Sequence, residues 1–474
     1  MSAPSVSESR VAPAGRPAGT TFLMRLSRAT FDQPDSTFPM NKSMKFPLAS
    51  AGRERRTAVP ARARRIPVSR HPAFHCWKLW AALALPGLLL PNVAQGEHAA
   101  ELIATADSLR LPNGRTSHNH SASIVQTPRG DLLACWFHGH GERGDNSMVV
   151  MGARKKPGAR AWSRPFVMAD HKNLPDQNPT MFIDPQGRLW LFRVSSLDNE
   201  QRGHFLTYAI STDYEGEGPP KFGLAAPLFA FPRNLESAYV AEVDRLLATG
   251  EVSKEKRAEM TKAREMTEEK IWQRFGWMPR QPPIMVDGKM VLGLYTDVWR
   301  CSLMAMTDDG GKSWEFSDAI ILPDTPITYN LQPALVRKKN GHLVAFMRAR
   351  PVLRRAESAD GGMTWTEDPI DIRCPNSSVA ALGLKNGNWM LAVNDGKGRS
   401  VLTVYLSGDE GKTWRWKRAL ENFEPQQGSG HYPTLIQAAD GRIHIVYTFS
   451  NEVAFKGNTI KHARFDEAWV KAGE

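Results

Sequence analysis

The chain has 474 residues, which is enough for one large all-β domain or for two to three ordinary domains. Its formal net charge is +12, but residues 1–96 hold 14 Lys and Arg against four Asp and Glu. The rest of the chain holds 47 basic and 45 acidic residues and is nearly neutral. The basic character therefore belongs to a leader, which argues against a nucleic-acid-binding face.

The leader, residues 1–96, has the pattern of an export signal. Arg62, Arg64, Arg65, Arg70 and Lys78 precede an apolar run at 79–90, and a small-residue cleavage site follows at 94–96. The run has about a dozen residues, whereas a membrane span needs roughly 20. We expect export to the periplasm or the cell exterior, with no stable membrane span after signal removal. A short membrane anchor is the alternative.

From residue 97 onward the chain repeats one unit, two β-rich runs joined by a glycine turn. The turn glycines are Gly130, Gly187, Gly288, Gly341, Gly387 and Gly441. Only the 101-residue spacing between the second and third is out of line, and it contains a Lys/Glu/Arg-rich stretch at 234–275 that predicts a helical insertion. Units of about 50 residues cannot bury their own apolar faces, so 97–474 is predicted to form an all-β, six-bladed β-propeller of four-stranded blades. A β-sandwich is the alternative, but it does not require six copies of one hairpin.

A second repeated element follows three of the hairpins. Residues 307–314, 358–365 and 407–414 share the pattern Ser/Thr-x-Asp-x-Gly-x-Ser/Thr-Trp. The Asp side chain is expected to bind backbone N–H groups of a turn, while glycine allows positive φ and Trp packs between sheet layers. The pattern resembles the Asp-box of sialidases and of the wider sialidase-like (BNR-repeat) propellers, over nearly all of 105–470. Because Asp-boxes usually lie away from the active site, the resemblance implies the fold, and the chemistry must come from other residues.

A site is expected at the mouth of the propeller channel. The first strand of a blade is innermost, and its start shares a face with the end of the antiparallel second strand. Polar and ionisable residues stand at these positions in the six units, and their convergence predicts one pocket. They include His120, Gln177, Asn178, Arg280, Tyr329, Gln332, Asn376 and Tyr432 at strand starts, and His140, Arg193, Tyr295, Asp297 and Arg348 at strand ends.

Sialidases hold an anionic sugar with three arginines, use a Tyr–Glu pair as nucleophile and use an Asp as acid/base. The resemblance assigns Tyr432 as the nucleophile and Asp145 as the acid/base. It also assigns Arg348 and Arg399 as two of the arginines, whose guanidinium forks suit a carboxylate. Two positions depart from the pattern. His120 stands where the first arginine is expected, and Gln332 replaces the glutamate, so Tyr432 lacks the usual base.

His120 and His140 flank one hairpin and favour a different chemistry. Neutral imidazole is a natural general base near neutral pH, and a nearby arginine can neutralise a uronate carboxylate. Related propellers include polysaccharide lyases and uronate-linked glycosidases, and His120, His140, Arg193 and Tyr432 resemble their catalytic set. The alternatives are structural, hydrogen-bonded histidines or, on weaker grounds, metal ligands.

The sequence thus predicts an enzyme that cleaves an acidic oligo- or polysaccharide, by exo-glycosidase (sialidase-like) hydrolysis or by uronate-directed β-elimination. The predicted catalytic residues are His120, His140, Asp145 and Tyr432, and the predicted substrate-binding residues are Arg193, Arg280, Gln332, Arg348, Asn376 and Arg399. No metal or cofactor is expected, since the cysteines outside the leader fit neither a metal motif nor a disulfide framework. A non-catalytic carbohydrate-binding propeller, or a scaffold whose insertion docks another protein, are the alternatives.

Overall fold

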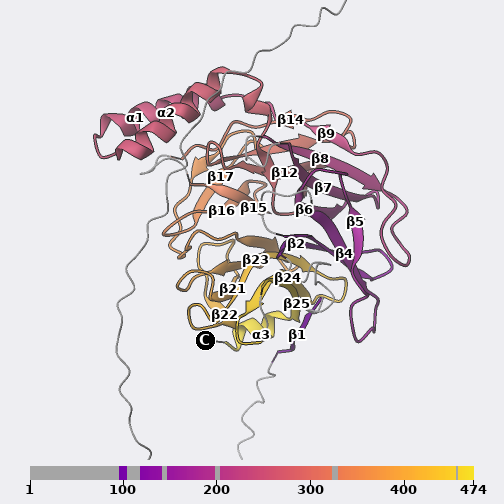
Figure 1. Cartoon of the computed structure of the whole chain (residues 1–474). Helices are drawn as coiled ribbons and strands as arrows, with labels where there is room; N and C mark the ends of the chain where they lie inside the picture. Colours follow the sequence, from indigo (N-terminus) through magenta and orange to yellow (C-terminus); the bar gives the residue numbers. More distant parts are fainter. Residues whose placement is uncertain are drawn as a thin grey trace, which may run out of the picture. The chain divides into compact units, whose positions relative to one another are not determined.

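The computed structural model describes residues 96–103, 118–140, 147–197, 203–322, 329–454 and 457–473. The predicted signal at 79–90 and Asp145 lie outside these residues. The described part forms six antiparallel sheets, and their innermost strands contact one another in a closed ring (Figure 1). The predicted six-bladed β-propeller with four-stranded blades and a helical insertion is confirmed.

Each blade is a run of consecutive strands counted outward from the channel. Blade one contains β2 (His118–Gln126), β3 (Leu132–Gly139), β4 (Val149–Lys155) and β5 (Phe166–Ala169), and blade two contains β6 (Asp176–Ile183), β7 (Leu189–Ser196), β8 (His204–Ser211) and β9 (Ala226–Leu228). Blade three has a divided inner strand, β10 (Trp277–Pro279) and β11 (Ile284–Val286), both paired with β12 (Lys289–Thr296), then β13 (Cys301–Thr307) and β14 (Glu315–Phe316). Blade four contains β15 (Leu331–Arg337), β16 (Leu343–Arg348), β17 (Arg354–Ser358) and β18 (Thr366–Glu367). Blade five contains β19 (Ala380–Gly383), β20 (Trp389–Asn394), β21 (Val401–Ser407) and β22 (Trp416–Asn422).

Blade six closes the ring with strands from both ends of the described chain. It contains β23 (Gly428–Gln437), β24 (Ile443–Asn451) and β25 (Thr459–Phe465), and β1 (His98–Leu102) pairs antiparallel with β25 as its outermost strand. The short helix α3 (Glu467–Lys471) follows, capped by the Asp466 carboxylate, which accepts from Trp469 N at 2.7 Å. The segment directly after the leader is therefore part of the fold, and it holds the first and last blades together.

The core lies between neighbouring blades because successive side chains of a strand point to opposite faces. On β12, Leu292 and Leu294 pack in a cluster with Trp190 and Phe192 of blade two. The preceding residue, Val291, points to the opposite face and packs in a cluster with residues of blade four. Strands buried on both faces explain the nearly continuous apolar runs of the repeat.

The Asp-boxes form the predicted turns. Asp360 Oδ1 accepts from the backbone N–H groups of Met363 and Thr364, each at 3.0 Å, and Oδ2 accepts from the Thr364 hydroxyl at 2.6 Å. Burial alone would raise the pKa of Asp360, but these hydrogen bonds outweigh it and lower that pKa to about 2.

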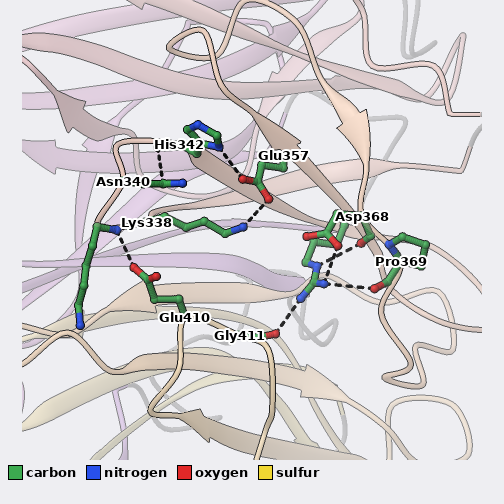
Figure 2. A network of polar contacts seen from close by, with 10 residues as sticks. Lys338, Asn340, His342, Glu357, Asp368, Pro369, Glu410 and Gly411 are labelled. Atoms are coloured by element: carbon green, nitrogen blue, oxygen red, sulfur yellow. Dashed lines mark hydrogen bonds and ion pairs between the residues drawn. The ribbon is translucent and has the colours of Figure 1, made fainter.

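Two Asp-boxes also bind the preceding blade. Tyr208 Oη of blade two donates to Gly311 O at 2.6 Å, and Arg355 of blade four donates to Gly411 O at 2.8 Å. Figure 2 shows the second contact at Gly411, beside a blade-four cluster in which His342 Nδ1 lies 2.7 Å from Glu357 Oε1. Trp314, the tryptophan of the blade-three Asp-box, also packs against the preceding blade, since its ring centroid lies 6.3 Å from that of Phe192 in blade two. The expected packing between sheet layers is thus packing between adjacent blades.

The insertion after blade two consists of α1 (Leu235–Ala248), α2 (Lys254–Glu268) and the 3₁₀ turn η3 (Trp272–Arg274). Ser253 caps α2 by accepting from Lys256 N at 3.3 Å, and α1 buries Leu235, Tyr239 and Val243 in the cluster shared by blades two and three. The two helices lie side by side beyond the sheets (Figure 1). None of the helices in the described ranges has both the length and the hydropathy needed to cross a bilayer.

Candidate functional site

A cavity of about 290 Å³ opens among the inner ends of the blades. Strand starts and second-strand ends supply most of its wall, as expected. The lining residues are His120, Phe137, Gln177, Asn178, His204, Met278, Tyr295, Asp297, Arg300, Tyr329, Leu331, Gln332, Arg348, Arg399 and Tyr432. Blades one to four and six are all represented in the strands of this wall, and Arg399 comes from the turn between β20 and β21 of blade five.

Bulges in four inner strands turn side chains toward the channel. The pairing register shifts at equivalent places in β2, β6, β15 and β23. The residues in the bulges, Ser121, Asn178, Gln332 and Tyr432, have φ of 58°, 46°, 58° and 57°. A proline follows Asn178, Gln332 and Tyr432. Because proline has no backbone N–H to donate, it is compatible with an interruption of the hydrogen bonds between the two strands. The bulges thus explain how Asn178, Gln332 and Tyr432 reach one cavity.

Tyr432 is the centre of the site. Arg348 Nη1 donates to its hydroxyl at 2.7 Å, and Gln332 Nε2 lies 3.4 Å from the same oxygen. Arg348 Nε donates to Asn376 Oδ1 at 2.7 Å, which fixes the guanidinium from a neighbouring blade. No carboxylate is hydrogen-bonded to Tyr432 among the residues that the structure describes, and the amide of Gln332 is the group that faces its hydroxyl beside Arg348.

Asp297 follows β12 and supplies the one carboxylate of the cavity wall within the described ranges. Burial alone would lower the pKa of Arg348, but the Tyr432 hydroxyl and the Asp297 carboxylate outweigh it and raise that pKa. Burial, reinforced by Asp297, raises the pKa of Tyr295 far above its ordinary value. Arg348 therefore stays a cation and Tyr295 stays a neutral phenol over the working pH range.

Three guanidinium groups surround the Tyr432 ring. Arg399 lies 5.0 Å, Arg280 5.3 Å and Arg348 5.9 Å from its centroid. Arg280 lies beneath the cavity and not on its wall, only 1% exposed, where it donates to the carbonyls of Tyr432 and Pro433. Burial lowers the pKa of Arg280 to about 10, so it remains charged near neutrality and supports the Tyr432 bulge from below.

The His120 ring packs against Tyr432, with ring centroids 4.2 Å apart and the ring planes tilted by 49°. Its Nδ1 lies 2.9 Å from the Thr448 hydroxyl of blade six, which fixes the ring orientation. Burial, followed by the neighbouring His431 and His118 and by the charges of Arg399 and Arg280, lowers the pKa of His120 well below its ordinary value. The imidazole is therefore neutral near neutral pH, and it can accept a proton as a weaker base than free histidine.

The other predicted residues lie elsewhere. His140 directly follows β3 and does not line the cavity, and Asp145 lies outside the described residues. Arg193 is buried, also outside the cavity wall, and its Nη1 pairs with Asp176 at 2.9 Å. Asn376 does not line the cavity, and its link to the site is the hydrogen bond that it accepts from Arg348.

Sequence reasoning missed Arg300 and His204, which both line the cavity. Neither occupies a start or end of the first two strands of a blade, because Arg300 precedes β13 and His204 begins β8. The Asn-Pro, Gln-Pro and Tyr-Pro pairs at the bulges were a usable signal for re-aimed side chains that the hairpin pattern did not exploit. No sequence pattern of this kind points to Arg300 as a cavity residue.

The cavity places cationic hydrogen-bond donors, which can bind the carboxylate of a ligand, beside a phenol and a neutral imidazole. Within the described part of the chain, no group of three or more His, Cys, Asp or Glu side chains is arranged to hold a metal ion. Arg348 and Arg399 can bind an anionic group, while His120 and Tyr432 can exchange protons with a bound sugar.

Comparison with known proteins settles the family. A family model described as BNR repeat-like domain matches residues 130–218 and 244–445, more than half of the chain. The chain belongs to the BNR repeat-like family. The match extends from the hairpin turn of blade one into blade six of this BNR repeat-like protein, and it includes all three complete Asp-boxes.

Solved structures share the fold of this BNR repeat-like chain. A Dyadobacter fermentans protein of unknown function is 15% identical, with a TM-score of 0.56 over 79% of this chain and 99% of that one. The intramolecular trans-sialidase of Ruminococcus gnavus is 12% identical, with a TM-score of 0.54 over 75% of this chain and 96% of that one. The α-L-arabinanase of Penicillium chrysogenum is 15% identical, with a TM-score of 0.50 over 77% and 97%. No curated protein matches the sequence. At these identities the likeness shows a sialidase-like fold, and the chemistry has to be argued from the site.

Proposed function

We infer that this protein is a carbohydrate-active enzyme that cleaves an acidic glycan, with β-elimination next to a uronate as the favoured reaction. The observation that carries the proposal is the environment of Tyr432. Its hydroxyl is bound by Arg348 at 2.7 Å and faced by the Gln332 amide, while the ring of the neutral His120 packs against its ring at a tilt. A phenol without a carboxylate base is poorly suited to nucleophilic attack, whereas a phenol–imidazole pair suits proton transfer.

The substrate carboxylate would bind Arg348 and Arg399, whose charges make the adjacent C5 proton more acidic. His120 would then remove that proton, and the electron pair would form the C4–C5 double bond. The C4–O bond would break, and the leaving oxygen would take a proton from the Tyr432 hydroxyl. Water is not consumed, and the new chain end is an unsaturated uronate.

Hydrolysis is the second candidate, and it is supported by Asp297 on the cavity wall. A carboxylate in the cavity can act as a general base for water or as an acid toward a glycosidic oxygen. This route predicts new reducing ends without unsaturated product. The similarity to the trans-sialidase fold makes sialosides the first substrates to test for this route.

One panel separates these candidates. The purified protein is incubated with polyuronates, sulfated and unsulfated glycosaminoglycans and sialosides, and product is followed by near-ultraviolet absorbance and by a reducing-end assay. Absorbance together with reducing ends supports elimination. Reducing ends without this absorbance, or release of free sialic acid, would show that the reaction is hydrolysis and not elimination. Saturable binding with no product from any glycan would instead indicate a non-catalytic carbohydrate-binding propeller.

We also propose that the protein is exported. The support is the basic stretch followed by the apolar run at 79–90 and the small residues at 94–96, directly before β1 begins at His98. Fractionation of cells expressing the full chain, compared with a variant lacking 79–90, tests the proposal. Equal retention of both proteins inside the cell would refute it.

A further inference from the structure

Two arginines flank Tyr329 at the edge of the cavity formed by blades three and four. The Arg300 guanidinium lies 5.7 Å from the Tyr329 ring centroid, and the exposed Arg350 lies 5.2 Å from it. Tyr329 and Arg300 both line the cavity. Tyr329 is also connected to the central site, because its hydroxyl accepts from Asn376 Nδ2 at 3.1 Å and Asn376 binds Arg348. The group Arg300, Tyr329 and Arg350 is called the rim cluster below.

The helical insertion holds Arg300 in the rim cluster. Glu259 of α2 forms an ion pair with the Arg300 guanidinium. The preceding Trp299 is fully buried, and its Nε1 donates to Ala263 O of the same helix at 3.0 Å. Arg300 has φ of 54°, a left-handed conformation that a non-glycine residue adopts only when its surroundings fix it. Helix α2 therefore orients a turn that forms part of the cavity wall.

The charges of the cavity call for more than one anion. Its wall carries Arg300, Arg348 and Arg399 against the single carboxylate of Asp297 among the described residues, and its buried His120 is neutral. Glu259 pairs with Arg300, so once a substrate carboxylate is bound by Arg348 and Arg399, the excess positive charge of the rim cluster is that of the exposed Arg350. Arg300 is only partly exposed, so its own charge is less screened than one in free solution.

We propose that the rim cluster is a second anion-binding subsite, which takes a carboxylate or sulfate ester on a neighbouring sugar of the same oligosaccharide. Arg300 and Arg350 bind the anionic group, and Tyr329 contributes a flat face for the sugar ring. Glu259 is a positioning residue that acts through Arg300. The proposal rests on the proposed function, since it assumes that an acidic sugar already occupies the site around Tyr432.

The test compares matched ligands that differ by one anionic group. Titration calorimetry gives dissociation constants for galacturonate against digalacturonate, and for an unsulfated against a singly sulfated chondroitin disaccharide. The first pair adds a whole uronate residue with its carboxylate, whereas the second adds a sulfate alone and so isolates the effect of the charge. Wild type is compared with Arg350→Met and Glu259→Gln, and Glu255→Gln, an exposed position on the same helix, serves as the matched control. Thermal unfolding checks that each variant is folded.

The second anionic group is expected to tighten binding to wild type by up to about fivefold, the upper range for one partly exposed charge pair. Arg350→Met should remove most of this gain and weaken the salt dependence of the doubly charged ligand. Glu259→Gln keeps the positive charge of Arg300 but loses the ion pair that orients it, so it should reduce the gain less. Both variants should leave galacturonate binding unchanged. Glu259→Asp should restore part of the gain. Equal affinity of wild type for both members of each pair, or equal losses on singly and doubly charged ligands, would refute the subsite alone. Failure of every ligand to bind would refute the proposed function, and the subsite with it.

Discussion

Replacing Arg348 by methionine is the sharpest test of the site. The side chain keeps its length and much of its volume but loses the guanidinium that donates to Tyr432 Oη and Asn376 Oδ1, both at 2.7 Å. Asn376 lies in the segment that connects blades four and five, and Tyr432 lies in blade six, so the variant removes the charge and also the link between these two parts of the cavity. The fold should survive because the apolar interior of β16 is unchanged.

The size of the effect follows from the pairing with a substrate carboxylate. A partly buried guanidinium–carboxylate interaction is worth about 3 kcal/mol when one partner is removed. At about 1.4 kcal/mol for each factor of ten, kcat/KM should fall by about two orders of magnitude. Arg348→Lys keeps the positive charge but cannot form the two parallel hydrogen bonds of a guanidinium, so its kcat/KM should lie between those of wild type and Arg348→Met.

The assay is steady-state cleavage of the best substrate from the glycan panel, with thermal unfolding as a check on folding. Arg415→Met removes an exposed arginine of blade five and serves as the control, with activity expected to match wild type. If Arg348→Met retained activity within about threefold of wild type while folded, the carboxylate would not be held by Arg348 and the reasoning would fail.

Three further predictions concern Gln332 and His120 in the cavity and Asp360 in an Asp-box turn. Gln332→Glu introduces a carboxylate next to the Tyr432 hydroxyl, so elimination should fall and any sialoside hydrolysis should rise; unchanged product ratios would contradict this reading. Because the pKa of His120 is well below its ordinary value, wild-type kcat/KM should stay flat from about pH 8 to about pH 6, and an acid limb near the pKa of free histidine would exclude His120 as the base. Asp360→Asn should lower stability by about 1 kcal/mol at neutral pH. The folded pKa of about 2 lies below the unfolded value, so this difference should vanish as the pH falls from about 4 to about 2, which thermal unfolding across pH would detect.

Much of the site could be predicted because strand ends repeat with the blade. His120, Gln332, Arg348, Arg399 and Tyr432 were chosen from hairpin positions or family resemblance, and all five line one cavity. Arg193 and Arg280 also stand at such positions, yet neither lines it. A buried Asp176 beside Arg193, and backbone carbonyls around Arg280, decide where those guanidinium groups point. The repeat of the hairpins predicts which residues lie at the strand ends near the channel, but it does not predict which partners their side chains contact.

The sequence by itself determined the six hairpins, the Asp-box turns and the helical insertion, because each depends on residues within a few positions of one another. The tertiary structure alone decided that β1 completes blade six, that bulges point Gln332 and Tyr432 at each other, and that α2 holds Arg300 at the cavity edge. Arg348 and Tyr432 are 84 positions apart in the chain, and their contact exists only once the ring of blades has closed. Local patterns cannot encode such a contact, because it depends on how several blades pack together.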